Sequence, residues 1–153
     1  MKTQMKDIDE LVGLRLAYLK EDLGHLDEKD VSSIESSLPD YFQRHLNQDL
    51  FVYTTIEDKK IVSCAFLLLL EKPMSPSFIN GKTGIVLNVY TKPEYRHKGY
   101  ARKVMNELLE DAKKMELCTI ELKSTDDGYS LYKAVGFKDD PLEYHFMKWK
   151  NES

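Results

Sequence analysis

The stretch TGIVLNVYTKPEYRHKGYARKVMNELLEDAKKM, Thr83–Met115, changes its pattern of apolar residues part-way along. Its first nine residues are mostly apolar and predict a buried strand that ends at Thr91, because Pro93 cannot continue it. Farther along, apolar residues recur at helical spacing and form one stripe: Tyr100, Val104, Leu108, Ala112 and Met115. We therefore expect a strand, a tight loop and a helix at the centre of the fold.

Two helices are predicted before this unit. Apolar residues over Ile8–Leu19 recur at helical spacing, with Asp7 placed to cap the helix and Gly24 placed to end it. A second helical segment runs over about Glu28–Leu46. We expect Pro39 to break or restart it, because proline lacks an amide hydrogen and clashes with the preceding turn.

Strands are predicted on both sides of the central unit. The segment Asp49–Pro73 contains two, joined by a polar turn at 57–59, and the second is so apolar that we expect it to be central. After the unit come a strand over 117–124, a short helix over 130–135 and a last strand over 144–149. This order predicts an α/β fold in a single domain, residues 1–153.

The overall charge and hydropathy exclude several classes of protein. Lys and Arg number 22 against 26 Asp and Glu, and this acidic balance argues against general nucleic-acid binding. The most hydrophobic run, Ile61–Leu70, is about half the length that a membrane span requires. The first ten residues lack the apolar core of a signal peptide. We therefore expect a cytoplasmic protein without nucleic-acid or membrane partners.

The cysteines and histidines carry no further chemistry. Cys64 and Cys118 each lie in an apolar run, which is typical of reduced core residues in a cytosolic protein. His45 and His145 have no partner at metal-ligand spacing, so no metal site is expected.

Positive charge gathers in KPEYRHKGYARK, Lys92–Lys103, which has five basic residues and a histidine among twelve positions. The helix predicted to begin near Gly99 would expose unpaired amides and the positive end of its dipole there. Glycine lets a ligand approach the backbone closely, and the basic side chains suit two or more phosphates better than one. No lysine–hydroxyl pair follows the glycine, so this is not a P-loop. A helix start with solvated basic residues remains the alternative.

Two motifs resemble the GCN5-related N-acetyltransferases, the GNAT superfamily. Arg96–Ala101 matches that family's acetyl-CoA signature, [Q/R]-x-x-G-x-[G/A], and follows the strand-ending sequence LNVYTKPEY. In LYKAVGF, Tyr132 stands four residues before a Gly-Phe pair, as in the family. The resemblance covers Asp7–Lys148 and is strongest over Gly84–Phe137. Within the family, the sequence is similar to a broad, mainly uncharacterised bacterial branch. It implies a mixed, mostly antiparallel central sheet flanked by helices and splayed at the acetyl-CoA strand.

The resemblance also implies roles for individual residues. Acetyl-CoA would be the co-substrate, and an amine would attack its thioester directly. Tyr132 would be the general acid that protonates the departing thiolate, for which a tyrosine pKa near 10 is suitable. The residues expected to contact acetyl-CoA through backbone, charge or hydroxyl groups are Val89, Tyr90, Thr91, Arg96, His97, Lys98, Gly99, Tyr100, Ala101, Arg102 and Ser124.

The general base and the acceptor stay open. Many family members use a glutamate on the signature strand, but here Asn88 is the only polar side chain in the strand interior. A water chain or an N-terminal residue (Glu21, Asp22, His25 or Glu28) could serve instead. The acceptor amine is not identified by the sequence, and a homodimer is possible. A CoA-binding regulatory module without turnover is the alternative function.

Overall fold

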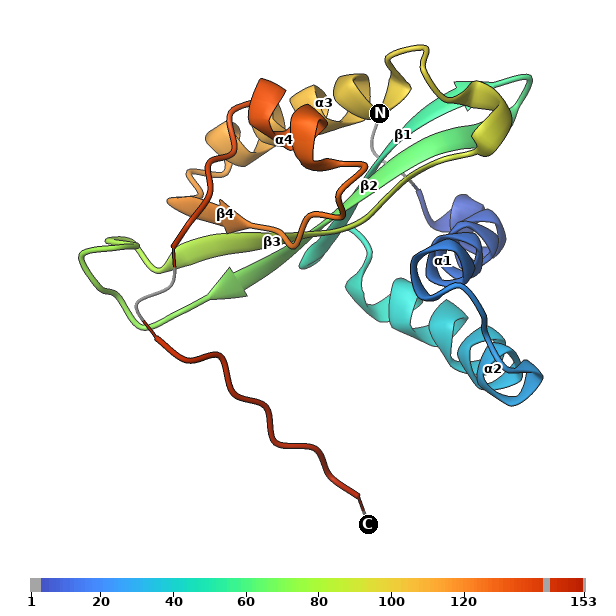
Figure 1. Cartoon of the computed structure of the whole chain (residues 1–153), viewed down its shortest axis with the longest axis horizontal. Helices are drawn as coiled ribbons and strands as arrows, with labels where there is room; N and C mark the ends of the chain where they lie inside the picture. Colours follow the sequence, from blue (N-terminus) through green and yellow to red (C-terminus); the bar gives the residue numbers. More distant parts are fainter. Residues whose placement is uncertain (1–3, 142–143, 153) are drawn as a thin grey trace.

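The computed structural model describes residues 4–141 and 144–152. Short 3-10 segments cover Met5–Asp7 and Pro93–Tyr95. The helices are α1 (Ile8–Leu23), α2 (Glu28–His45), α3 (Tyr100–Lys114) and α4 (Tyr129–Ala134). The strands are β1 (Leu50–Glu57), β2 (Lys60–Glu71), β3 (Lys82–Thr91) and β4 (Thr119–Glu121) (Figure 1). Within these described residues, no helix has both the length and the apolar character needed to cross a membrane.

The strands form one sheet in the order β1-β2-β3-β4. The first two pairings are antiparallel, whereas β4 runs parallel to β3 and pairs with it only over Thr83–Ile85. From Val86 onward, therefore, β3 has no strand on its β4 side among the described residues. This geometry confirms the predicted mixed, mostly antiparallel sheet, splayed at the strand that leads into the basic loop. The central position predicted for β2 is confirmed as well.

The sheet separates two hydrophobic cores. On one face, α1 and α2 contribute Leu11 and Phe42 to a cluster with Val52 and Phe66 from the strands. On the other face, α3 places its apolar stripe against the sheet, with Leu108 fully buried. Figure 1 shows α1 and α2 on one side of the sheet and α3 and α4 on the other. The predicted stripe on α3 is thus the side that the helix buries.

The second helix is continuous, so the expected break at Pro39 is wrong. α2 runs without interruption from Glu28 to His45 with Pro39 inside it. Apolar residues on both sides of the proline pack into the same core: Leu38 lies against it, and Phe42 is fully buried in it. Packing on one continuous face outweighs the local cost of the proline, which is about 3 kcal/mol in a helix interior.

The two ends of α1 show which of its predicted start and end signals the structure contains. Gly24 ends α1 with φ 78°, the left-handed conformation that favours glycine, as predicted. Asp7 makes no side-chain cap of α1, and this part of the prediction is wrong. Its carboxylate instead accepts a hydrogen bond from the Gln4 amide at 3.2 Å, because a 3-10 turn precedes the helix.

The C-terminal part departs most from the prediction. The strand expected over 117–124 is reduced to the three residues of β4. The strand expected over 144–149 is wrong: these residues form no ladder, and Tyr144 and Trp149 are each 83% exposed. Figure 1 shows this end of the chain leading away from the sheet. Cys118 is exposed rather than in the core, although Cys64 is buried and both thiols are free.

Candidate active site

A β-bulge bends β3 just before its end. The pairs Cys64–Tyr90 and Phe66–Leu87 leave two residues of β3, Asn88 and Val89, opposite one residue of β2. Asn88 takes φ 52°, a conformation that asparagine tolerates better than most residues. The bulge increases the local bend, and in the described part of the chain β3 beyond it has no strand on its β4 side.

Buried polar contacts hold the bulge. Asn88 is 2% exposed, and its Oδ1 accepts a hydrogen bond from Arg15 Nη1 of α1 at 3.2 Å. Its Nδ2 faces Cys64 Sγ at 3.7 Å. Three residues along, the hydroxyls of Ser63 and Thr91 are hydrogen-bonded at 2.7 Å inside the protein. The end of β3 is therefore fixed by side chains as well as by its ladder.

The start of α3 presents a set of unpaired amides. Among the described residues, no backbone carbonyl accepts from the amides of 97–102, and the first bond is Lys103 N–H to Gly99 C=O at 3.1 Å. Such amides and the helix dipole favour an anion at this position. The backbone turns into the helix through two left-handed residues, His97 (φ 63°) and Gly99 (φ 84°).

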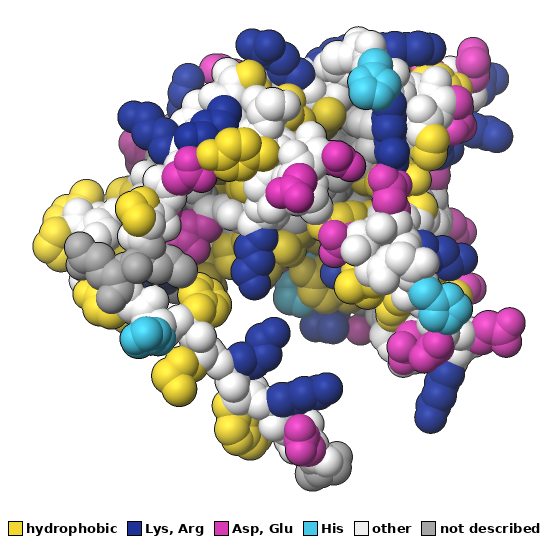
Figure 2. Space-filling view, in the orientation of Figure 1, with side chains coloured by type: hydrophobic (Ala, Val, Ile, Leu, Met, Phe, Trp, Pro, Cys, Tyr) yellow, Lys and Arg dark blue, Asp and Glu magenta, His cyan; other side chains and the backbone are white. Residues whose placement is uncertain are grey.

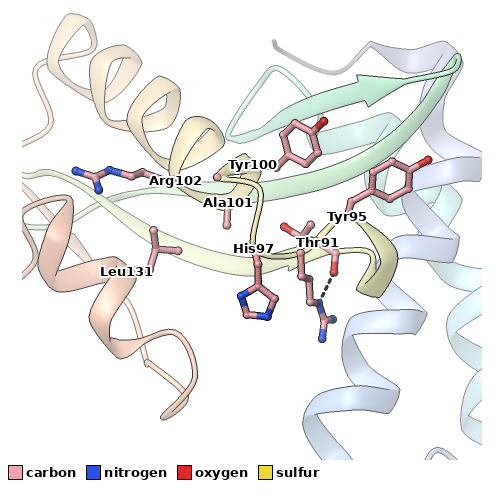
Figure 3. Close-up of a pocket in the computed structure, with 9 residues that line it drawn as sticks. Thr91, Tyr95, His97, Tyr100, Ala101, Arg102 and Leu131 are labelled. Atoms are coloured by element: carbon pink, nitrogen blue, oxygen red, sulfur yellow. Dashed lines mark hydrogen bonds between the residues drawn. The ribbon is translucent and has the colours of Figure 1, made fainter.

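A cavity of about 290 Å³ lies at this turn. It is lined by Thr91, Tyr95, Arg96, His97, Gly99, Tyr100, Ala101, Arg102 and Leu131. Figure 3 shows Ala101 and His97 on the turn, with Leu131 reaching toward it from α4. A Cβ built on Gly99 would meet nothing within 4 Å, so the space beside this residue is open to a ligand. The structure thus brings seven of the eleven expected acetyl-CoA contacts to one cavity.

Arg96 does not project freely into this cavity. Its Nη2 pairs with Glu21 Oε2 at 2.6 Å, and its Nε donates to the Thr91 carbonyl at 2.8 Å. The hydrogen bond to Glu21 raises the pKa of Arg96 above its ordinary value. Arg96 therefore ties the loop to α1 and is less available for phosphate than the sequence suggested.

Lys98 and Arg102 are the more available cations. Among the residues described, neither has a carboxylate within ion-pair distance. Lys98 Nζ lies 5.5 Å from the centroid of the Tyr95 ring. In Figure 3, Arg102 points along α3, away from Tyr95 and Tyr100. The Tyr100 hydroxyl donates to Glu57 Oε1 at 2.8 Å, so its proton is not available to a ligand.

Tyr132 lies on α4 next to the cavity-lining residue Leu131. Its ring is half-buried and meets the Phe137 ring edge-on, with the ring centroids 6.0 Å apart. Burial, with a smaller contribution from Tyr18 of α1, raises the pKa of Tyr132 to about 12. In the described part of the chain its hydroxyl has no hydrogen-bond partner. The sequence-based expectation of a pKa near 10 is therefore corrected upward, because the ring is partly removed from water.

The remaining four expected contacts, Val89, Tyr90, Lys98 and Ser124, do not line the cavity. Val89 and Tyr90 belong to the splayed part of β3, where their backbone is open on the β4 side. Ser124 is exposed, and its hydroxyl donates to the neighbouring Thr125 carbonyl at 2.7 Å. Two lining residues were missed, Tyr95 and Leu131. Tyr95 stands inside the basic stretch and could have been included, whereas nothing in the local sequence singles out Leu131.

The candidate bases from the N-terminal part of the chain do not lie together at the end of β3. Glu21 reaches the end of β3 through its ion pair with Arg96. His25 is held by Asp27 at 3.1 Å in an exposed turn, and Glu28 is exposed at the start of α2.

The chain matches the family model described as the acetyltransferase (GNAT) family over residues 15–137. The chain belongs to the GNAT family. The matched residues include β3, the basic loop and α3. The resemblance stated from the two motifs is thereby confirmed.

Individual relatives agree with this assignment. A predicted acetyltransferase of Clostridium acetobutylicum, whose crystal structure contains acetyl-CoA, is 30% identical with a TM-score of 0.84. The match covers 97% of this GNAT chain and 94% of that chain. A GCN5-related N-acetyltransferase from Ralstonia eutropha JMP134 has the same fold, at 20% identity and a TM-score of 0.79, with 96% of each chain covered. An uncharacterized N-acetyltransferase, ycf52 of Porphyra purpurea, is 30% identical over 70 residues, 46% of this chain and 40% of that relative's length.

Proposed function

We propose that this GNAT protein is an acetyl-CoA-dependent N-acetyltransferase that transfers an acetyl group to a primary amine by direct attack. The observation that carries the proposal is the set of unpaired amides over 97–102 at the start of α3. They border the cavity of about 290 Å³ next to the open end of β3. The acetyl-CoA in the Clostridium acetobutylicum relative supports the same donor here.

The residues present fit the pyrophosphate and the pantetheine arm of this donor. The pyrophosphate would bind the amides of 97–102, with Arg102 of the cavity wall and the neighbouring Lys98 of the loop supplying charge. The open space beside Gly99 lets phosphate oxygens come within hydrogen-bonding distance of the backbone. The pantetheine arm would follow the backbone of Val89–Thr91, beside which the described residues place no strand on the β4 side.

The protein's main contribution to the reaction would be to hold the two reactants in line. Acetyl-CoA supplies an activated acyl group, and the amine needs only the correct position and an unprotonated nitrogen to attack it. A backbone amide of the bulged part of β3 could stabilise charge that develops on the carbonyl oxygen. The contacts of Asn88 with Arg15 and Cys64 keep this part of the strand in place.

Tyr132 would be the general acid for the departing thiolate. Its hydroxyl has no described partner and can donate to the sulfur as negative charge develops there. A pKa of about 12 makes it a weaker acid than a solvated tyrosine. The same burial would raise the pKa of the leaving thiol, since low dielectric disfavours both anions. Since both pKa values would rise, the difference between the pKa of the Tyr132 hydroxyl and that of the CoA thiol would be smaller than the raised pKa of Tyr132 alone suggests.

The second candidate function is a CoA-binding module without turnover. β3 carries no carboxylate, Asn88 is committed to Arg15, and the charge of Glu21 is neutralised by Arg96. A site without an effective base would bind acetyl-CoA and release no CoA thiol. Incubation with a broad panel of amines, monitored by thiol release and by mass of the acetylated product, distinguishes the two functions.

Calorimetry with acetyl-CoA tests the proposed cradle through a matched pair of glycine variants. Gly99 and Gly24 both have positive φ, and a Cβ on either would meet nothing within 4 Å. We expect Gly99→Glu to weaken acetyl-CoA binding at least about a hundredfold, because a carboxylate would face the pyrophosphate. Gly24→Glu imposes similar backbone strain at the end of α1, which contributes no lining residue to the cavity, and should leave the affinity unchanged.

Two outcomes would count against the proposal. If the wild-type protein binds no acetyl-CoA near neutral pH, both candidate functions fail. If Gly99→Glu binds as tightly as wild type, the amides of 97–102 are not the pyrophosphate site. Equal losses in both glycine variants would point to general backbone strain and would contradict the cradle as well.

A further inference from the structure

Arg15 is a half-buried cation on the side of α1 that faces β3. Its Nη1 donates to Asn88 Oδ1 at 3.2 Å, and this amide carries no charge. Among the described residues, no carboxylate lies within ion-pair distance of the guanidinium. Arg96, by contrast, pairs with Glu21 at 2.6 Å. Since a guanidinium has several N–H donors, most of those of Arg15 are left for another acceptor.

A shortage of acidic residues does not explain this missing counter-ion. α1 and α2 each contain more acidic than basic residues, and Figure 2 shows acidic side chains on the outer surface of this helix pair. The neighbours of Arg15 one turn away along α1 are all uncharged: Leu11, Val12, Tyr18 and Leu19. Taking a cation partly out of water without a charged partner costs free energy. A negatively charged group on a ligand would therefore be stabilised at this position.

Two tyrosine side chains lie near the guanidinium. Arg15 Cζ is 6.0 Å from the centroid of the Tyr18 ring, and Tyr41 approaches from α2. Burial raises the pKa of both hydroxyls, and the nearby charge of Arg15 acts in the opposite direction on each. In the described part of the chain, neither hydroxyl has a hydrogen-bond partner, and both side chains are half-buried. The three side chains thus supply hydrogen-bond donors that match a carboxylate, which only accepts.

This group of donors lies beside the place of the proposed reaction. Asn88, which Arg15 contacts, belongs to the β-bulge next to Val89–Thr91, where the pantetheine arm would lie. Tyr18 is close enough to Tyr132 to contribute to the raised pKa of that residue. The same side of α1 therefore reaches both the bulge of β3 and the proposed general acid on α4. An acceptor held at Arg15 would have its amine in this space.

We propose that the acceptor is an amino acid whose carboxylate binds Arg15 and the hydroxyls of Tyr18 and Tyr41, while its amine attacks acetyl-CoA. The carbon–sulfur bond of acetyl-CoA breaks as the carbon–nitrogen bond forms. The nitrogen loses one proton and the sulfur gains one, which gives the N-acetylated amino acid and the CoA thiol. This inference rests on the proposed acetyl transfer, but the carboxylate site can also be tested without turnover.

Matched pairs of substrates measure the contribution of the carboxylate. Each standard amino acid is compared with the amine formed by removing its carboxylate, such as L-phenylalanine with 2-phenylethylamine. We expect wild type to acetylate at least one amino acid in preference to its amine. Arg15→Gln should lower kcat/KM for that amino acid about tenfold to a hundredfold and for the amine less than about threefold. If Arg15 only supported Asn88, both substrates would lose equally.

Arg44→Gln is the matched control, because it removes the same charge from the neighbouring helix. Arg44 is exposed on α2 and pairs with Asp40 at 2.8 Å, so the preference for the amino acid should stay within about twofold of wild type. Tyr41→Phe removes one proposed donor and keeps the ring. It should lower kcat/KM for the amino acid by about threefold to tenfold and leave the amine unchanged.

The failure of this inference differs from the failure of acetyl transfer. Wild type that uses the amines as well as the amino acids, or equal losses for both in Arg15→Gln, overturns the carboxylate site alone. If no amine of either kind is acetylated, the proposed function fails, and calorimetry with CoA present decides: amino acids should bind wild type and bind Arg15→Gln at least about tenfold more weakly. No binding to wild type overturns the inference. If Arg15→Gln does not fold, propionate should still compete with the amino acid for wild type, and absence of competition overturns it.

Discussion

At the scale of single residues, the site is built around backbone conformations that most side chains avoid. Asn88, His97 and Gly99 take φ of 52°, 63° and 84° within twelve residues. Non-glycine residues in this region cost of order 1 kcal/mol or more and persist only where surrounding contacts hold them. Buried contacts of Asn88 with Arg15 and Cys64 supply such support at the bulge. The left-handed residues at 97 and 99 turn the chain so that the amides of 97–102 lie unpaired beside the cavity.

The role of Tyr132 can be tested by removing its hydroxyl. We expect Tyr132→Phe to lower kcat about a hundredfold while changing the affinity for acetyl-CoA less than twofold, since general acids contribute about that much to rate. Because burial raises the pKa of this group to about 12, wild-type Tyr132 stays protonated below pH 10. Steady-state kinetics from pH 6 to about pH 10 would check both points.

The control for this variant is Tyr129→Phe. Tyr129 lies on the same helix, and its hydroxyl donates to Asp139 rather than facing the cavity. Its rate should stay within about twofold of wild type. An unaltered rate in Tyr132→Phe would remove this residue from the reaction. A loss of activity that begins well below pH 10 and disappears in that variant would contradict the raised pKa.

At the scale of elements, the short helix α4 is positioned by a close contact at its start. A Cβ on Gly128, the residue just before the helix, would lie 2.8 Å from Cε2 of the Tyr132 ring. The φ of Gly128 is −85°, so its backbone could accommodate alanine. The glycine is therefore needed for space rather than for conformation, and the space is occupied by the proposed general acid.

We expect Gly128→Ala to move the Tyr132 ring and to lower kcat about tenfold, since small displacements at a reacting centre are costly. Acetyl-CoA affinity and fold should be retained, because the clash is with the end of a side chain and not with backbone. Gly13→Ala is the control: this exposed glycine of α1 has nothing within 4 Å. That variant should keep wild-type activity and gain about 0.5–1 kcal/mol in unfolding free energy.

The measurements are steady-state kinetics, calorimetry with acetyl-CoA and thermal unfolding of both variants. Wild-type kcat in Gly128→Ala would mean that the ring moves without consequence. Equal loss of binding and rate would mean that α4 as a whole has shifted.

At the scale of the whole molecule, one sheet connects two cores, and none of the described helices contributes to both. The α1–α2 core includes Leu11, and the α3 core includes Leu108, both fully buried. β2 lies at the centre of the sheet, and its side chains Phe66 and Leu67 belong to opposite cores. Since the same strand is needed by both cores, we propose that the chain unfolds as a single domain.

Alanine substitutions on the two faces test this proposal. Leu11→Ala and Leu108→Ala should each cost about 2–5 kcal/mol and lower the midpoint of one common transition. Thermal and urea unfolding, followed by circular dichroism, would measure both. Two separable transitions, each moved by only one of the variants, would show that the faces unfold independently.

Much of the fold could be predicted because it depends on neighbours in the sequence. The turn between β1 and β2 and the end of α1 follow from short polar and glycine signals, which act over a few residues. The unit Thr83–Met115 follows from a change of apolar period, and it also brings the basic loop and the helix start together. That is why most of the expected acetyl-CoA contacts lie on one cavity.

What the sequence by itself determined is thus this local unit and, through it, the cavity-lining turn where we propose that acetyl-CoA binds. Tertiary structure alone decided the continuity of α2 through Pro39, the capture of Arg96 by Glu21, the raised pKa of Tyr132 and the position of Tyr144–Trp149. The physical reason is the same in each case. Packing, ion pairing, burial and strand pairing depend on groups that are distant in the chain. A local sequence pattern does not specify which of these distant groups will be in contact in the folded protein.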